Sequence, residues 1–81
     1  MVVKILFFAT FKEKAGIRET ALEVEEGTTV LALKERLAQE FPGLSGGLKS
    51  ALVSINREFA FDEDQITAGA EVAIFPPVSG G

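Results

Sequence analysis

Residues 27–43 read GTTVLALKERLAQEFPG, and this stretch decides the fold of the chain. Gly27 permits a turn, and Thr28 or Thr29 offers a hydroxyl N-cap to the segment that follows. The apolar side chains that then recur every three or four residues are Val30, Leu33, Leu37 and Phe41. This spacing predicts an amphipathic helix of about three turns. The closing proline and glycine end it, because proline disfavours helical geometry in the preceding residue and glycine permits a reversal.

Two strands are expected before this helix. Residues 2–10 are rich in β-branched and aromatic side chains, and residues 19–25 alternate between polar and apolar types. The alternation places apolar side chains inward and the glutamates in solvent. Residues 12–16 read as a charged connection, which is short enough to predict an antiparallel hairpin.

Further strands are expected after the helix. Residues 44–50 read as a loop, and residues 51–55 as a buried strand that ends at the turn Asn56-Arg57. Residues 58–61 form a shorter strand after that turn. An acidic loop then buries Ile66 before the last strand.

The last strand, residues 71–75, completes a pattern of two strands, one helix and two or three strands. This order predicts an α+β domain in which a single main helix covers one face of a sheet of four to five strands. The helix supplies about half of the core of such a domain.

The composition excludes whole classes of chemistry. A chain of 81 residues forms one domain, because so short a chain buries only about 60% of its unfolded surface. It has no cysteine and no histidine, which excludes disulfides, thiolate nucleophiles, Ser-His-Asp catalysis and the commonest transition-metal ligands. No metal site is expected, and any chemistry must use carboxylates, amines, hydroxyls or the chain ends.

Charge and hydropathy narrow the possible partners. Eight Lys and Arg against twelve Asp and Glu give a formal net charge of −4, which opposes nucleic-acid phosphates. Residues 1–10 are apolar but contain Lys4, and they are too short for a signal peptide or a membrane span. We therefore expect a cytoplasmic protein that contacts neither nucleic acid nor membrane.

The tail, residues 76–81, departs most from what folding needs. Pro76 and Pro77 hold the chain extended, and the final two glycines carry no side chain. Beyond a domain of residues 1–75, this segment can span roughly 20 Å at about 3.3–3.6 Å per residue. It predicts a stiff stem that ends in a thin tip with a carboxylate. The alternative is an ordinary frayed terminus.

A pair of aromatic residues is expected on the sheet face that the helix leaves open. Phe8 and Phe75 each fall on the far side of their strand, and Phe59 is a possible third member. Neighbouring exposed rings beside the tail indicate a binding patch. The alternative is that residues 44–50 cover this face.

Three stretches resemble one known family. VKILFFA at residues 3–9, VSIN at residues 53–56 and EVAIFPPVSGG at residues 71–81 are similar to the small subunit of molybdopterin synthase, a family of sulfur carriers in molybdenum cofactor synthesis. The resemblance covers essentially the whole chain and is most specific in FPPVSGG, residues 75–81. The turn at residues 68–70 reads Ala-Gly-Ala, where the family often has acidic residues.

The resemblance implies a ubiquitin-like β-grasp fold in which the first and last strands lie parallel and adjacent. Parallel neighbours would bring the Phe8 and Phe75 rings together beside the root of the tail. Phe8, Phe59 and Phe75 are then the expected partner contacts.

The resemblance also implies a mechanism for a non-catalytic subunit. An activating enzyme uses ATP to adenylate the Gly81 carboxylate, and a sulfur relay converts it to a thiocarboxylate. In a heterotetramer, the tail enters the large synthase subunit, which supplies the catalytic side chains and receives sulfur for a cyclic pyranopterin monophosphate. The chain itself binds no cofactor. The tail residues that carry Gly81 there are Pro76, Pro77, Val78, Ser79 and Gly80.

Two other functions stay open at this stage. One is a related carrier for thiamine or tRNA thiolation, or a protein modifier that attaches through Gly81 to lysines. The other is a plain β-grasp interaction domain, since a fold does not fix a function. The whole FPPVSGG motif favours the molybdenum pathway, because thiamine-pathway carriers resemble it mainly in the final two glycines.

Overall fold

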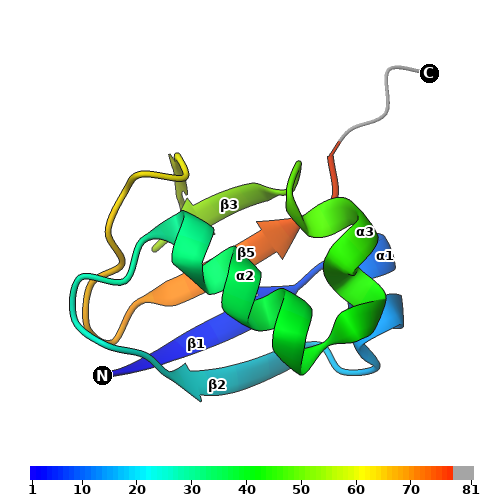
Figure 1. Cartoon of the computed structure of the whole chain (residues 1–81), viewed down its shortest axis with the longest axis horizontal. Helices are drawn as coiled ribbons and strands as arrows, with labels where there is room; N and C mark the ends of the chain where they lie inside the picture. The colour runs from blue at the N-terminus through cyan, green and yellow to red at the C-terminus, as the bar shows by residue number, and fades with distance from the viewer. Residues whose placement is uncertain (78–81) are drawn as a thin grey trace.

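A five-stranded mixed sheet with helices on one face makes up residues 1–77, the part of the chain that the computed structural model describes (Figure 1). The strands are β1 (Val2–Phe7), β2 (Glu19–Glu23), β3 (Leu52–Ile55), β4 (Glu58–Ala60) and β5 (Glu71–Phe75). The helical segments are α1 (Ala9–Ala15), α2 (Val30–Glu40), the 3-10 turn η1 (Pro42–Leu44) and α3 (Ser45–Leu48). The predicted α+β class, with one main helix, is confirmed.

The strand order across the sheet is β2-β1-β5-β3-β4. β1 and β5 pair in parallel, with Ile5 opposite Val72 and Phe7 opposite Ile74. All other neighbouring strands are antiparallel. The expectation that the first and last strands lie parallel and adjacent is therefore confirmed, and β5 occupies the middle of the sheet.

Helix α2 forms where the apolar spacing predicts it. The Thr29 hydroxyl caps its first turn by accepting a hydrogen bond from the Ala32 amide at 3.1 Å. Val30, Leu33 and Leu37 are at most 1% exposed and pack on the sheet. The helix ends at Glu40, before the proline that the sequence places at position 42.

Lys34 is a buried charge that the apolar pattern does not reveal. It lies on α2 with a side chain only 7% exposed, and its Nζ atom is 2.8 Å from Asp62 Oδ1. It also donates to the Lys49 carbonyl at 3.4 Å. Lys34 thus ties the helix to the acidic loop after β4, where the predicted burial of Ile66 is confirmed at 3% exposure.

Residues 44–50 are not the loop that their composition predicts. Leu44 and Leu48 are 0% and 2% exposed, and their burial holds η1 and α3 in helical form against α2. Gly47 makes room for this packing, since a Cβ there would lie 3.1 Å from the Phe11 ring. Tertiary contact therefore overrides the weak helical propensity of Ser-Gly-Gly.

The connection after β1 also differs from the expectation. The predicted strand over residues 2–10 ends at Phe7, and most of the predicted connection is helix α1 (Ala9–Ala15), which is anchored by Phe11 at 1% exposure. The predicted antiparallel pairing of the two strands is confirmed. Gly16 ends the helix in a left-handed conformation, with φ of 79°. Within residues 1–77, no helix is long and apolar enough to cross a membrane.

Candidate functional site

The candidate site lies on the sheet face turned away from the helices, here called the open face. Val3, Ile5 and Phe7 of β1 are at most 2% exposed and point toward the helices. Alternation therefore turns their neighbours the other way. The large or buried apolar side chains on the open face are Leu6, Phe8, Leu52, Phe59, Ala73 and Phe75.

Phe8 and Phe75 stack on each other. Their ring centroids are 4.7 Å apart and their planes are inclined by 15°. The parallel register causes this contact: Phe7 lies opposite Ile74, so the next residues of the two strands lie side by side. The Phe8 amide donates to the Ile74 carbonyl at 3.2 Å, which continues the pairing by one residue. The predicted proximity of the two rings is confirmed, and their role as partner contacts stays a prediction.

Phe59 lies on the same face, on β4, with β5 and β3 between it and β1. It pairs with Ser54 across β3 and β4, and Ser54 in turn pairs with Ala73 on β5. Ser54 and Ala73 are 7% and 8% exposed and form a low floor, whereas Phe59 is 76% exposed.

Together these side chains border a depression of about 420 Å³, here called the aromatic groove. Its lining residues are Leu6, Phe8, Ser54, Arg57, Phe59, Glu71, Ala73 and Phe75. All three predicted partner contacts therefore line one groove.

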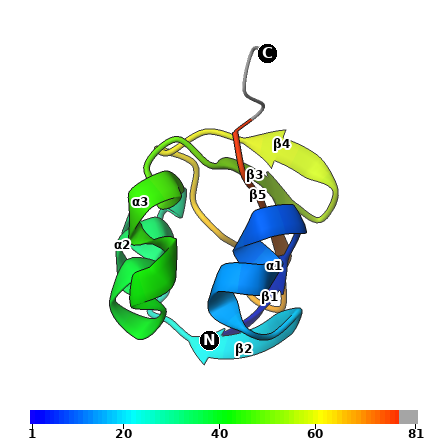
Figure 2. The same ribbon diagram turned by 90° about the vertical axis from the view of Figure 1, so that its right-hand side faces the viewer.

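The alternative in which residues 44–50 cover the open face is wrong. Figure 2 shows α3 beside α2 on the helical side of the sheet, with β4 well away from both. The open face is therefore free of any covering segment among residues 1–77, and Phe8 stays 40% exposed there.

The root of the tail adjoins this groove. β5 ends at Phe75, where the chain leaves the sheet through Pro76 and Pro77, drawn in red in Figure 1. Neither proline has an amide hydrogen, so the hydrogen-bond ladder cannot continue past Phe75. Pro76 is half-buried and Pro77 is exposed. The other predicted tail residues, Val78, Ser79, Gly80 and Gly81, lie outside the described residues.

Arg57 and Glu71 also line the groove, and sequence reasoning missed both. Arg57 and Glu71 are the two charged residues among the lining residues of the groove, most of which are apolar. For Glu71, the strand alternation predicted that the side chain lies on the same face as Phe75, but not that it lines a groove. For Arg57 the available signal was the two-residue turn Asn56-Arg57, where hairpins usually have Asn-Gly.

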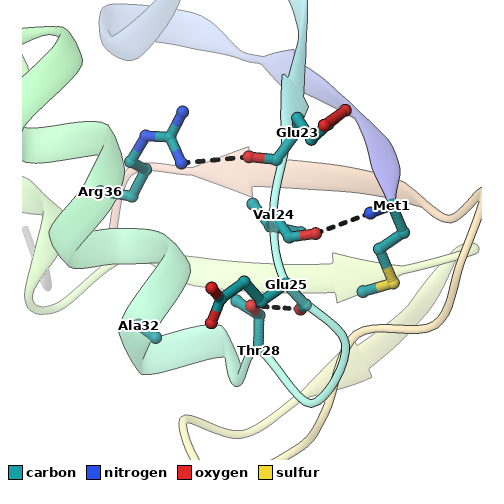
Figure 3. A pocket seen from close by; sticks show the side chains of 7 residues that line it. All are labelled: Met1, Glu23, Val24, Glu25, Thr28, Ala32 and Arg36. Atoms are coloured by element: carbon teal, nitrogen blue, oxygen red, sulfur yellow. Dashed lines mark hydrogen bonds between the residues drawn. The ribbon is translucent and has the colours of Figure 1, made fainter.

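A second hollow, of about 500 Å³, lies between the end of β2 and helix α2 (Figure 3). Several of its polar groups are paired within the fold: Arg36 Nη1 donates to the Glu23 carbonyl at 3.1 Å and the Met1 amino group to the Val24 carbonyl at 2.8 Å. The Thr28 hydroxyl donates to a neighbouring carbonyl at 2.6 Å. The Arg36 bond joins α2 to β2, and the other two hold the adjoining backbone in place, so these bonds serve the fold. Within residues 1–77, no three His, Cys, Asp or Glu side chains are grouped so as to hold a metal ion.

Comparison with known proteins gives consistent matches over the whole chain. The profile of the ThiS family matches residues 5–81. The molybdopterin synthase sulfur carrier subunit of Chlamydomonas reinhardtii is 34% identical, and the match covers 100% of both chains. The subunit of the same name from Escherichia coli strain K12 is 33% identical, over 99% of this chain and 100% of the relative.

Among solved structures, the small archaeal modifier protein 1 of Haloferax volcanii has a TM-score of 0.82 and 30% sequence identity. The superposition covers 95% of this chain and 98% of that one. The likeness extends across the whole sheet and its helices, so the β-grasp fold that the resemblance implies is confirmed.

Proposed function

Since the chain belongs to the ThiS family, we propose that it acts as the sulfur-carrier subunit of a molybdopterin synthase. Relatives with that name match it from end to end at about one third identity, as the 34% and 33% values above state. The chain also has the FPPVSGG ending on which the expectation from sequence rests.

The placement of the Phe8–Phe75 stack at the root of the tail carries this proposal. Exposed aromatic rings supply large apolar area with little loss of side-chain freedom, and they are enriched at the centres of interfaces. A partner that covers the aromatic groove holds the domain where β5 gives way to Pro76. That partner is therefore positioned to receive the tail. We assign the groove to the large synthase subunit and, in a separate encounter, to the activating enzyme.

The chemistry that we propose takes place at the Gly81 carboxylate. The activating enzyme joins this carboxylate to AMP with release of pyrophosphate. The outer sulfur of a persulfide on the relay then displaces AMP to form an acyl disulfide, and a thiol cleaves its S–S bond to leave the thiocarboxylate and a disulfide. The chain has no histidine and no cysteine, and we assign the base and the phosphate-binding groups of these steps to its partners. Glycines at positions 80 and 81 suit this task, because a Cβ beside the reacting carbonyl would obstruct access from both partners.

The proposal extends to the assembly in which the chain works. In a heterotetramer with the large subunit, the thiocarboxylate passes sulfur to a cyclic pyranopterin monophosphate. ATP is consumed by the activating enzyme, and the carrier itself holds neither nucleotide nor metal. We place this reaction in the cytoplasm.

Intact-mass spectrometry tests the proposal in two steps. Incubation of the chain with ATP, an activating enzyme and a sulfur source should raise its mass by about 16 Da, the difference between sulfur and oxygen in one carboxyl group. The loaded chain, mixed with the large subunit and the pterin precursor, should then return to its original mass as dithiolene forms. A chain that never gains this mass would refute a sulfur-carrier role.

One observation favours a second candidate, a protein modifier. The small archaeal modifier protein 1 is 30% identical to the chain. In that role the activated Gly81 carbonyl would be attacked by a lysine amine, with loss of AMP and formation of an isopeptide bond. Adding a lysine-rich acceptor protein to the loading reaction separates the two functions: a modifier gives a covalent adduct, whereas a dedicated sulfur carrier gives only the thiocarboxylate.

A further inference from the structure

The turn between β3 and β4 holds an arginine in a backbone conformation that favours glycine. Asn56 and Arg57 form a two-residue connection between Ile55 and Glu58, and their φ angles are 50° and 73°. Hairpin loops with two positive φ angles usually read Asn-Gly, because the left-handed conformation brings a Cβ close to the following carbonyl oxygen.

The two turn residues differ in what offsets this strain. The Asn56 side-chain oxygen accepts a hydrogen bond from the Glu71 amide at 3.0 Å, which ties the turn to β5. The Arg57 side chain makes no hydrogen bond and no ion pair with any of residues 1–77. Because no contact within the described fold offsets the backbone strain at Arg57, the strain indicates that this side chain has a role in contacts with another molecule.

Arg57 lines the aromatic groove beside Phe59. As far as the described residues go, it is the one cation on the groove wall, and Glu71 is the one carboxylate. These two groups do not pair with each other, since the ion pairs in this part of the chain all join other residues. The guanidinium group is exposed and available to a partner.

The position of Arg57 along the groove determines which part of a bound partner can contact it. The Asn56 amide donates to the Glu71 carbonyl at 2.8 Å, so the turn lies beside the first residue of β5. Phe75 and the root of the tail are at the other end of that strand, about 13 Å away at roughly 3.3 Å per residue. Arg57 therefore lies at the opposite end of the groove from the Phe8–Phe75 stack, and a protein that covers the whole groove contacts both.

We infer that Arg57 is a specificity residue, which pairs with a carboxylate on the large synthase subunit when that subunit covers the aromatic groove. The inference rests on the proposed function for the choice of that partner. A guanidinium forms two parallel hydrogen bonds to a carboxylate, so it fixes the orientation of a partner that apolar contact alone leaves free to rotate. At the rim of an interface such a pair acts mainly on the association rate and on the choice of partner.

Replacement by glycine separates this role from a structural one. Arg57→Gly removes the charge and gives the turn the residue that its φ angle favours. The melting temperature should stay unchanged or rise by up to about 5 °C. Binding to the large subunit, followed by surface plasmon resonance at low ionic strength, should weaken by about five- to tenfold, mostly through the association rate.

Two further variants and a salt series complete the experiment. Arg57→Lys keeps the charge but cannot form the two parallel hydrogen bonds, so it should restore the association rate and only part of the affinity. Lys49→Ala removes an exposed cation near the helices, and it should bind within about twofold of the wild type. At about 0.5 M salt the gap between wild type and Arg57→Gly should shrink, because ions screen a rim charge pair.

The binding and melting-temperature results distinguish the inference about Arg57 from the proposed function. Equal binding of wild type and Arg57→Gly at low salt would overturn the inference and leave the proposed function intact. A fall of several degrees in the melting temperature of Arg57→Gly would also overturn it, since the arginine would then be stabilising its own turn. A wild-type chain that does not bind the large subunit would refute the proposed function and the inference with it.

Discussion

Truncation of Phe75 to alanine should cost about twice as much free energy in partner binding as in the stability of the fold. The ring is half-buried and stacks on Phe8 at 4.7 Å. Loss of this contact and of the partial burial should lower the free energy of unfolding by about 1 kcal/mol, or roughly 4–8 °C in melting temperature. For comparison, truncation of a fully buried Phe costs about 3–5 kcal/mol.

The expected loss in binding comes from the apolar area of the Phe75 ring that is exposed in the free chain and that a partner would cover. Phe75 and Phe8 together present one stacked apolar surface at the root of the tail. Aromatic residues at the centre of an interface commonly contribute about 2 kcal/mol or more when truncated. This corresponds to a roughly thirtyfold rise in the Kd for the large subunit, at about 1.4 kcal/mol per factor of ten. Isothermal titration calorimetry and thermal unfolding measure the two effects on the same sample.

The chain offers matched controls for this experiment. Phe59 and Phe61 are 76% and 73% exposed, yet only Phe59 lines the aromatic groove. Phe59→Ala should therefore weaken binding about tenfold, and Phe61→Ala by less than about threefold, with little change in stability for either. Ile74→Ala, next to Phe75 but 0% exposed, should unfold the domain more easily by about 2–5 kcal/mol.

One pattern of results would refute the reasoning. If Phe75→Ala unfolds as easily as Ile74→Ala but binds the large subunit as tightly as the wild type, the open-face rings belong to the core. Equal losses of affinity from Phe59→Ala and Phe61→Ala would show that the groove does not define the docking surface.

Three further predictions concern the tail and the buried lysine. Removal of Gly81, or amidation of its carboxylate, should abolish the mass gain of about 16 Da while the melting temperature stays within about 1 °C, because tail residues add little to the core; normal loading of the truncated chain would contradict this. Replacement of Pro76 and Pro77 by glycine should slow single-turnover sulfur transfer by about tenfold at saturating large subunit, since two freed residues cost about 1.4 kcal/mol to order again, and an unchanged rate would reject the role of a stiff stem. Lys34→Ala should lower the free energy of unfolding, measured in urea, by about 2 kcal/mol. Lys34→Met should lower it by about half as much, because methionine keeps the aliphatic stem but not the ion pair with Asp62. Equal losses from the two variants would assign the whole effect to the charge.

The sequence predicts the parts of this fold in which local pattern and tertiary environment agree. The spacing of Val30, Leu33 and Leu37 matches the face of α2 that packs on the sheet. Strand alternation likewise places Phe8 and Phe75 on the open face, because a side chain in a paired strand has only two directions. The stack of the two rings then needs one more fact, the parallel pairing of β1 and β5, which came from the family resemblance.

Other parts depend on contacts between distant residues, and no local pattern contains them. Residues 45–48 are helical because Leu48 is buried and Gly47 meets the Phe11 ring, which lies far earlier in the chain. The charge of Lys34 is buried because Asp62 approaches it from another loop. Arg57 shows the same limit at the site: its turn is predictable from sequence, but the groove that it lines forms only after β1, β3, β4 and β5 have paired.

The central position of the last strand determines the order in which the domain can fold. β1 and β2 can pair early, as can β3 and β4, but these two halves of the sheet meet only through β5. The aromatic groove takes residues from both halves and from β5 itself. Joining segments so distant in the sequence is slow compared with forming a helix or a hairpin, because loop closure precedes the contacts that reward it. A nascent or partly folded chain therefore lacks the aromatic groove, and under the proposed function the large subunit would engage only molecules in which the final strand has already entered the sheet.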